Sequence, residues 1–166
     1  MASDVPEIRP KMRSILFVCT GNTCRSPLAE AICKRLLAEK LGCDPQDLPQ
    51  HGFQVNSAGV AATPGDAASE PSVEMAKEYG IDLAAHCSRM VNPELLENAT
   101  DIVAMTRSHA VVLMMRYSGY GPMPQLLCGP DQDLDDPIGG DLELYRHCTR
   151  TIETHLQRYL AEWLGS

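Results

Sequence analysis

The sequence predicts an α/β fold: a three-layer sandwich around a four-stranded parallel sheet. Short apolar segments rich in β-formers alternate along the chain with segments whose apolar residues recur at helical spacing. The first apolar segment also passes through a tight turn straight into a helix start. Strands that alternate with helices pair in parallel through crossover connections. The 166 residues suffice for one domain, which we place at residues 14–166 after a flexible lead-in over residues 1–13.

The first strand and helix carry the clearest local signals. Residues 14–19 form a short apolar run that predicts a buried strand, and residues 20–22 have turn chemistry. Ser26 is a preferred helix cap, and Pro27 is favoured at the first helical position. Apolar residues at helical spacing continue to Gly42, which is expected to end this helix.

A second strand is predicted at residues 53–57, before Gly59. Residues 61–69 are small and polar, with a proline and a glycine, and indicate a loop. The next helix is expected at residues 71–79, with Gly80 as its C-cap.

The remaining elements are a short helix from Asn92-Pro93, a strand at 101–105, a helix at 107–115, a strand at 125–128, an acidic loop at 131–140 and a helix at 141–164. The last helix is amphipathic, and its apolar stripe is predicted to consist of Leu144, Cys148, Ile152, Leu156, Tyr159, Leu160 and Trp163. Segments 42–51 and 117–124 carry no pattern that we can interpret. Ligands of such sheets bind beyond the carboxyl ends of the strands, which is where Cys19 is expected.

Composition narrows the functional classes. The net charge of −8 and the absence of a basic face argue against nucleic-acid binding. No run approaches the roughly 20 apolar residues of a membrane helix, and the polar N-terminus lacks an apolar signal core, so we expect a cytoplasmic protein. The seven cysteines are an odd number in a chain without a signal peptide, which argues against a disulfide framework. They include no CxxC pair, which argues against a structural zinc site.

Residues 18–27 combine a strand end, a tight loop and a helix start. Backbone N–H groups in such a loop can point inward, and the helix dipole adds positive potential, so the loop suits an anion such as phosphate. Arg25 offers a bidentate fork to phosphate oxygens, and a thiol at Cys19 would ionise readily in that field. A nucleotide-binding P-loop would need a lysine before the Ser or Thr, and this loop has Arg25 there.

These residues, with Pro27-Leu28-Ala29-Glu30 after them, resemble the low-molecular-weight protein tyrosine phosphatases, and the resemblance covers nearly the whole chain beyond residue 11. It implies that Cys19 forms a cysteinyl-phosphate and that Arg25 holds the phosphoryl oxygens. The implied phosphate-binding residues are Thr20, Gly21, Asn22, Thr23, Cys24 and Ser26.

The resemblance also implies supporting roles. Ser26 would help to stabilise the thiolate, and Asn22 would brace the loop in a left-handed backbone conformation. His86 matches a bracing histidine, or is an ordinary surface residue. Cys24 matches a second loop cysteine that can trap Cys19 as a protective disulfide, or is a buried spectator.

A leaving group needs a proton, and one carboxylate can supply it and later activate water. Asp136-Pro137 matches the family's Asp-Pro pair, so Asp136 is the expected general acid. Asp131, Asp133 and Asp135 are nearby competitors that we interpret as a solvated acidic loop, although Asp135 could contact a cationic substrate.

Three positions bear on the substrate. Phosphotyrosine-specific members commonly have an aliphatic residue where this chain has Thr23, and aromatic residues where it has Ile138 and the loop 61–69. Aromatic walls favour a phenol ring. The loop, residues 105–109 and the pair Gly139-Gly140 are similar to the protein arginine phosphatase branch, so we favour phosphoarginine, with phosphotyrosine as the alternative. Ile138 departs from that branch, which tends to have an aromatic residue there.

Two rival classes remain. Thiol-dependent arsenate reductases share this fold and loop but need two further relay cysteines after the third strand, and residues 105–115 contain none. A non-catalytic phosphoprotein-binding module would be expected to lose Cys19, Arg25 or Asp136, all of which are present. The favoured interpretation is a monomeric hydrolase that needs no metal or cofactor and acts on phosphorylated proteins.

Overall fold

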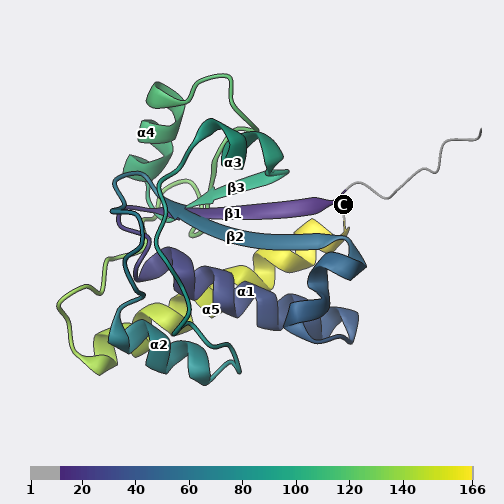
Figure 1. Cartoon of the computed structure of the whole chain (residues 1–166), viewed down its shortest axis with the longest axis vertical. Coiled ribbons are helices and arrows are strands. Elements are labelled where there is room, and N and C mark those ends of the chain that lie inside the picture. Colours follow the sequence, from purple (N-terminus) through teal and green to yellow (C-terminus); the bar gives the residue numbers. More distant parts are fainter. Residues whose placement is uncertain (1–11, 166) are drawn as a thin grey trace, which may run out of the picture.

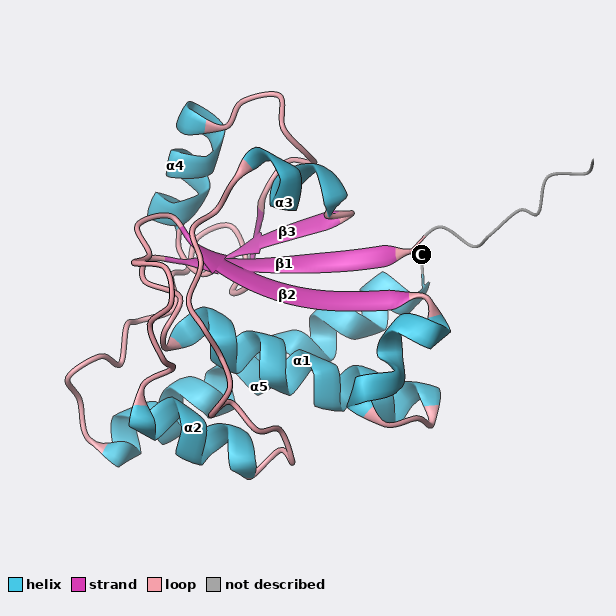
Figure 2. Cartoon of the chain, viewed as in Figure 1, coloured by secondary structure: helices cyan, strands magenta, loops and turns pink. Residues whose placement is uncertain are grey.

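The computed structural model describes residues 12–165, so most of the expected lead-in lies outside the described residues. A single sheet lies between two layers of helices, as predicted (Figures 1 and 2). The strands are β1 (Arg13–Cys19), β2 (Phe53–Gly59), β3 (Asp101–Ala104) and β4 (Gln125–Leu126). The helices are α1 (Arg25–Leu41), the 3₁₀ helix η1 (Pro45–His51), α2 (Glu70–Lys77), α3 (Pro93–Asn98), α4 (Arg107–Arg116) and α5 (Leu142–Gly165).

The four strands are parallel and lie in the order β2-β1-β3-β4. The chain moves from β1 to β2 on one side and then crosses back to β3 on the other. The switch point is therefore at the carboxyl end of β1, the place where such sheets bind ligands.

Successive side chains of β1 point to opposite faces of the sheet and belong to two separate hydrophobic cores. Ile15 and Phe17 are fully buried in the larger core, which α1 and α5 cover. Leu16 and Val18 point to the opposite face and pack with residues of α3 and α4. Among residues 12–165, no helix is both long enough and apolar enough to span a membrane.

Helix α1 begins two residues earlier than the sequence predicts, at Arg25 instead of Pro27. Cys24, rather than Ser26, occupies the N-cap position, and Leu28 N already donates to Cys24 O at 3.1 Å. The Ser26 hydroxyl makes contacts in the loop instead of capping the helix. Pro27 is still tolerated, since the first-turn N–H groups of a helix have no intrahelical acceptor.

Several other boundaries differ from the predicted ones. Arg13, placed in the lead-in from the sequence, is the first residue of β1. Helix α2 is capped by Ser69 and ends at Lys77, because the bonds that follow are of the tighter i→i−3 kind. Strand β4 has only two residues, because the chain turns at Gly129, whose φ is +93°.

The predicted stripe of α5 is buried at Cys148, Ile152, Leu156, Leu160 and Trp163, and Tyr159 is partly buried, but the start of the stripe differs. Leu144 is 43% exposed, and the neighbouring Tyr145 is buried in its place. Tyr145 points toward the loop after β1 and contacts Cys24 there. The aromatic ring at this position therefore connects the last helix with the first loop.

Candidate active site

Cys19 ends β1 at the carboxyl edge of the sheet and is 3% exposed. Its sulfur accepts a hydrogen bond from Asn22 N at 3.3 Å and lies 2.9 Å from Ser26 Oγ. Residues 20–24 wrap around the sulfur before α1 begins, so the N-terminus of α1 opens beside it. This arrangement favours negative charge at the sulfur and on a ligand above it.

Asn22 holds the loop in shape. Its φ of +57° is the left-handed value expected from the sequence, and it is fully buried. Its amide nitrogen donates to Ser26 Oγ at 2.8 Å and to Ser57 Oγ at 3.0 Å. Its amide oxygen accepts from Arg89 N at 3.0 Å, and its backbone oxygen lies 2.8 Å from His86 Nε2. His86 therefore contacts the loop rather than standing apart as a surface residue.

These contacts set the direction of the hydroxyl groups around the sulfur. Because Ser26 Oγ accepts a hydrogen bond from the side-chain amide of Asn22, its own hydroxyl proton is available for a hydrogen bond to Cys19 Sγ. The Ser57 hydroxyl in turn donates to Glu30 Oε1 at 2.7 Å. The sulfur is therefore surrounded by donors whose orientation is fixed by a buried network.

Arg25 and Asp136 meet at the mouth of the loop. Arg25 is 6% exposed, and its guanidinium donates to Leu134 O at 2.8 Å and to Asp136 Oδ2 at 3.3 Å. The other oxygen of Asp136 accepts from Ile138 N at 3.1 Å. The side chain of Asp136 is still 41% exposed, so it can reach an incoming ligand.

The other acidic residues of this loop are placed differently. Asp133 accepts from Arg107 N at 2.8 Å and from Arg107 Nε at 3.3 Å, and these hydrogen bonds lower its pKa. Asp131 and Asp135 are exposed. Asp133, Asp135 and Asp136 line a small hollow of about 100 Å³ beside α5.

Cys24, the second loop cysteine, is buried and forms no disulfide. Its sulfur lies 3.3 Å from Tyr145 Oη and 3.4 Å from Ser69 Oγ. Burial, followed by the contact with Cys24, raises the pKa of Tyr145 to about 12. The Thr23 hydroxyl has a weak contact at 3.8 Å with the Cys24 sulfur, and Thr23 O accepts from Ser69 N.

Sequence reasoning missed several supporting residues. Ser57 and Glu30 orient the loop, Tyr145 contacts Cys24, and His109 Nε2 lies 2.8 Å from Thr20 Oγ1. Glu30 and His109 stand in motifs that already carried the resemblance, but neither motif indicates the contact. Ser57 and Tyr145 gave no signal beyond their place in a strand and a helix.

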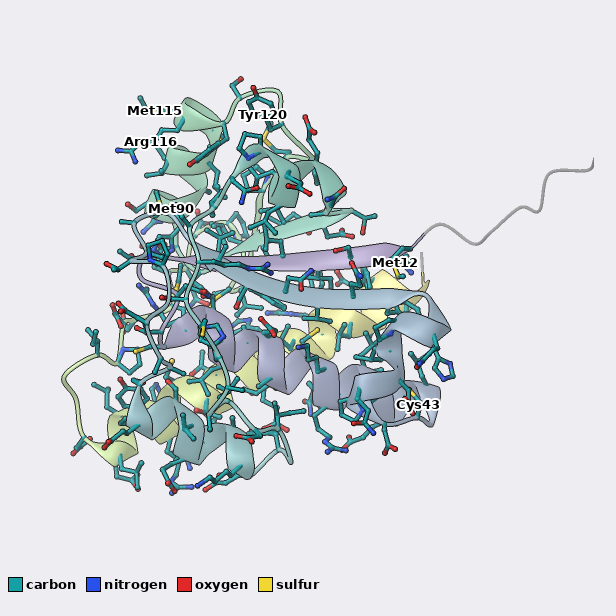
Figure 3. The ribbon with its side chains drawn as sticks, in the orientation of Figure 1. Met12, Cys43, Met90, Met115, Arg116 and Tyr120 are labelled. Atoms are coloured by element: carbon teal, nitrogen blue, oxygen red, sulfur yellow. The ribbon has the colours of Figure 1, made fainter. Side chains whose placement is uncertain are left out.

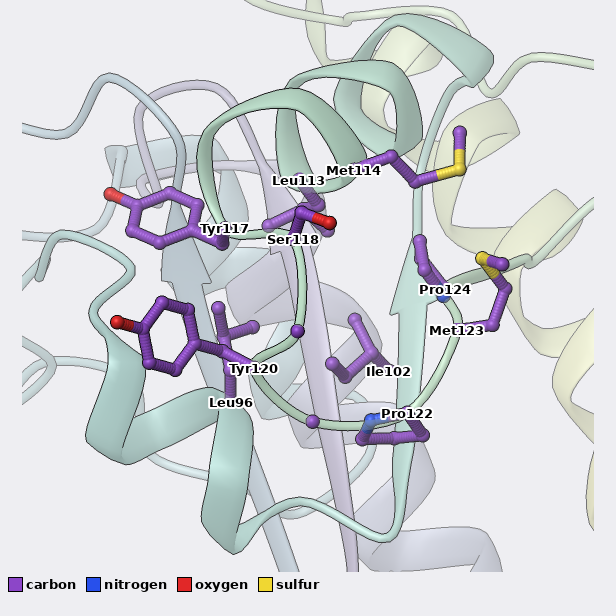
Figure 4. Close-up of a pocket in the computed structure, with 12 residues that line it drawn as sticks. Leu96, Ile102, Leu113, Met114, Tyr117, Ser118, Tyr120, Pro122, Met123 and Pro124 are labelled. Carbon is purple, nitrogen blue, oxygen red and sulfur yellow. The ribbon is translucent and has the colours of Figure 1, made fainter.

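A separate cavity of about 240 Å³ lies away from this loop (Figure 4). It is formed by α3, β3, α4 and the segment 117–124, and its lining includes Leu96, Ile102, Leu113, Tyr117, Tyr120 and Met123. Neither Cys19 nor Asp136 lines it, so we place the site at the loop after β1.

The site combines a thiol that accepts from a loop N–H and lies beside a serine hydroxyl with a guanidinium and a carboxylate at the opening of the loop. This combination, at the end of a parallel sheet, defines a cysteine-based phosphoryl-transfer enzyme. The sequence profile of the low molecular weight phosphotyrosine protein phosphatases matches residues 14–164. The chain belongs to this family, and the expected enzyme class, a cysteine-dependent protein phosphatase, is confirmed.

Individual relatives are named for two activities, protein arginine phosphatase and protein tyrosine phosphatase. A protein-arginine-phosphatase of Geobacillus stearothermophilus is 40% identical over 90% of this chain and 95% of its own. A low molecular weight protein-tyrosine-phosphatase, PtpB of Staphylococcus haemolyticus, is 34% identical over 80% of this chain and 86% of its own.

A solved structure supports the same grouping. It is the YwlE arginine phosphatase, in a cysteine-to-serine mutant whose active-site serine is phosphorylated. It is 36% identical and aligns with a TM-score of 0.78 over 92% of this chain and 96% of its own. The predicted three-layer fold is therefore confirmed.

Proposed function

We propose that the protein hydrolyses phosphoarginine in phosphorylated proteins, with Cys19 as the nucleophile. The thiolate attacks phosphorus, the bond from phosphorus to the guanidinium nitrogen breaks, and Asp136 gives its proton to that nitrogen. Asp136 then takes a proton from water, which attacks the cysteinyl-phosphate and releases inorganic phosphate. The phosphorylated serine of the YwlE mutant supports this assignment of the acceptor.

Arg25 and the loop hold the phosphoryl group in this proposal. The guanidinium lies between Leu134 O and Asp136, so it can turn its fork to two phosphoryl oxygens without leaving the mouth. The backbone N–H groups of residues 20–25 and the start of α1 supply the remaining positive potential. Ser26 and Asn22 keep the sulfur among donors, and His86 braces the loop from outside.

One observation carries the preference for phosphoarginine: a hydroxyl, rather than an aliphatic side chain, stands at Thr23 in a mouth without aromatic walls. Thr23 is partly exposed, and the contact of its hydroxyl with the Cys24 sulfur, at 3.8 Å, is weak, so the hydroxyl can turn to a guanidinium or to the attacking water. Segment 61–69 has no aromatic residue, and Ile138 is 64% exposed. The protein-arginine-phosphatase at 40% identity supports the same preference.

Phosphotyrosine is the second candidate, because the family profile and the staphylococcal relative carry that activity in their names. We also propose, from the sequence, that the protein is a cytoplasmic monomer without a cofactor and that Cys24 protects Cys19 by forming a disulfide under oxidation. Peptide mapping after peroxide treatment tests the disulfide. Terminally oxidised Cys19 beside free Cys24 would contradict it.

The substrate is tested by measuring kcat/KM for a phosphoarginine peptide and a phosphotyrosine peptide of the same sequence context. We expect the phosphoarginine peptide to be preferred, and Thr23→Ile to reduce that preference by about tenfold or more, as expected for the loss of one hydrogen bond. Thr154→Ile, an exposed threonine on α5, is the matched control and should change neither value. Equal or better turnover of the phosphotyrosine peptide by the unmodified protein would contradict the preference for phosphoarginine. It would not contradict the mechanism through Cys19.

A further inference from the structure

The loop after β1, residues 20–25, is called the phosphate loop below. A buried histidine outside this loop contacts its first residue, Thr20. His109 stands in the first turn of α4 and is 4% exposed. One ring nitrogen, Nε2, lies 2.8 Å from Thr20 Oγ1, and the other, Nδ1, lies 3.0 Å from Thr106 Oγ1. Both nitrogens of a buried imidazole are thus paired, each with a hydroxyl on a different segment.

The contacts at Thr106 are compatible with a tautomer in which Nδ1 is the acceptor and Nε2 carries the proton. Thr106 is the N-cap of α4, and its Oγ1 accepts from His109 N at 3.2 Å. The hydroxyl proton of Thr106 is therefore free to point at Nδ1. When Nδ1 accepts it, the neutral imidazole carries its own proton on Nε2 and donates a hydrogen bond to Thr20 Oγ1.

Burial and the neighbouring guanidinium keep the imidazole of His109 neutral. Burial, followed by the guanidinium of Arg25, lowers the pKa of His109 to about 4. Asp136 and Asp133 act in the opposite direction and are weaker causes. At neutral pH the ring is therefore a fixed donor toward Thr20 rather than a second cation beside the phosphate site.

Thr20 is held at a second point. Its backbone oxygen accepts from Ala61 N at 3.0 Å, while the imidazole holds its hydroxyl. Two anchors on one residue fix the plane of the peptide that follows, which carries the N–H of Gly21. That N–H belongs to the loop that surrounds the sulfur of Cys19.

We propose that His109 is a positioning residue that acts through Thr20: by donating from Nε2 it fixes the start of the phosphate loop, so that the backbone donors after Cys19 stay aimed at the phosphoryl oxygens. This inference rests on the proposed cysteine mechanism, but not on the choice between phosphoarginine and phosphotyrosine. An anchored loop needs no reorganisation when charge develops on the phosphoryl group, which is where fixed donors contribute most.

A double-mutant cycle tests this inference. His109→Phe removes the donor, Thr20→Val removes the acceptor with little change of shape, and the double variant removes both. We expect each single variant to lower kcat/KM for p-nitrophenyl phosphate by about tenfold, as for one ordinary hydrogen bond, and the double variant to lose no more than either. His109→Gln, whose amide can donate to Thr20 and accept from Thr106, should recover most of the activity.

A second readout requires no turnover. Calorimetric titration with orthovanadate should show the same pattern of about tenfold weaker binding in both single variants, with no further loss in the double variant. His51→Phe is the control, since His51 is an exposed histidine of η1, and it should leave both readouts unchanged.

The outcomes separate the two proposals. If the losses of His109→Phe and Thr20→Val add up in the double variant, His109 does not act through Thr20. Unchanged kcat/KM and vanadate affinity in Thr20→Val would also overturn this role. The measurement on Thr20→Val does not depend on whether His109→Phe folds. If the unmodified protein turns over no phosphate ester or phosphoarginine peptide, the proposed function fails. The vanadate cycle then still decides whether His109 positions the anion-binding loop.

Discussion

Replacement of Gly59 by alanine is expected to damage the phosphate loop, although Gly59 lies outside it at the end of β2. A Cβ at this position would lie 2.3 Å from Thr20 O and 3.1 Å from Asn22 N. Gly59 has little freedom to retreat, because its N–H donates to Arg89 O and its oxygen accepts from Val91 N, both at 2.9 Å. Met90, between those two partners, lies at the same end of the sheet (Figure 3).

The displacement follows from the contact distance. The separation from Thr20 O must grow from 2.3 Å to an ordinary contact of at least 3.4 Å, which is about 1.1 Å. Overpacking of this kind costs about 1–3 kcal/mol, and in a protein of this size each kcal/mol lowers Tm by about 2–4 °C. A misplacement of about 1 Å in a catalytic site can cost about 10²-fold in rate.

The assay is kcat/KM for p-nitrophenyl phosphate, measured together with Tm by calorimetry. We expect Gly59→Ala to lose about 10²-fold in kcat/KM and to melt several degrees lower. Gly165→Ala is the matched control, because no heavy atom lies within 4 Å of its added Cβ. Wild-type kcat/KM and Tm in Gly59→Ala would refute the argument that β2 supports the loop by close backbone contact.

Three further predictions concern single groups. Cys19→Ser should abolish turnover, because a serine hydroxyl is a far weaker nucleophile than a thiolate, and measurable steady-state hydrolysis would contradict the mechanism. Asp136→Asn should slow turnover by about 10²–10⁴-fold, the usual contribution of a general acid, and full activity would exclude Asp136 from that role. The lowered pKa of His109, about 4 against an ordinary 6.5, means that the unfolded chain binds the extra proton first. The contribution of His109 to the free energy of unfolding should therefore be fully present above pH 6.5. It should fall by up to about 3 kcal/mol as the pH drops to 4. The free energy of unfolding, measured with urea, should depend less steeply on pH in His109→Gln than in the unmodified protein. Identical slopes of the free energy against pH would contradict this role of His109.

Local signals made much of the fold and the loop predictable from the sequence. The β-rich run before Cys19, the turn residues after it and the apolar spacing beyond Pro27 each indicate an element without help from distant residues. The left-handed conformation of Asn22 and the contact of His86 with the loop were expected from the resemblance and are present in the structure.

The missed features depend on contacts between segments far apart in the chain. Tyr145 reaches Cys24 across 121 positions, and His109 reaches Thr20 across 89. Helical spacing alone did not separate Leu144 from Tyr145, since neighbouring residues differ in burial only once α5 packs on the sheet. The start of α1 was misplaced because Ser26 looks like a cap in the sequence, whereas its hydroxyl contacts Cys19 in the structure.

The two ends of the described chain are joined at the edge of the sheet opposite the phosphate loop (Figure 1). Arg13, at the start of β1, donates to Trp163 O at 2.6 Å and lies over the Trp163 ring, and Trp163 Nε1 donates to Asp101. A fluorophore or a surface tether attached at the exposed Met12, which lies at this end of the sheet (Figure 3), would therefore sit on the side away from the phosphate loop.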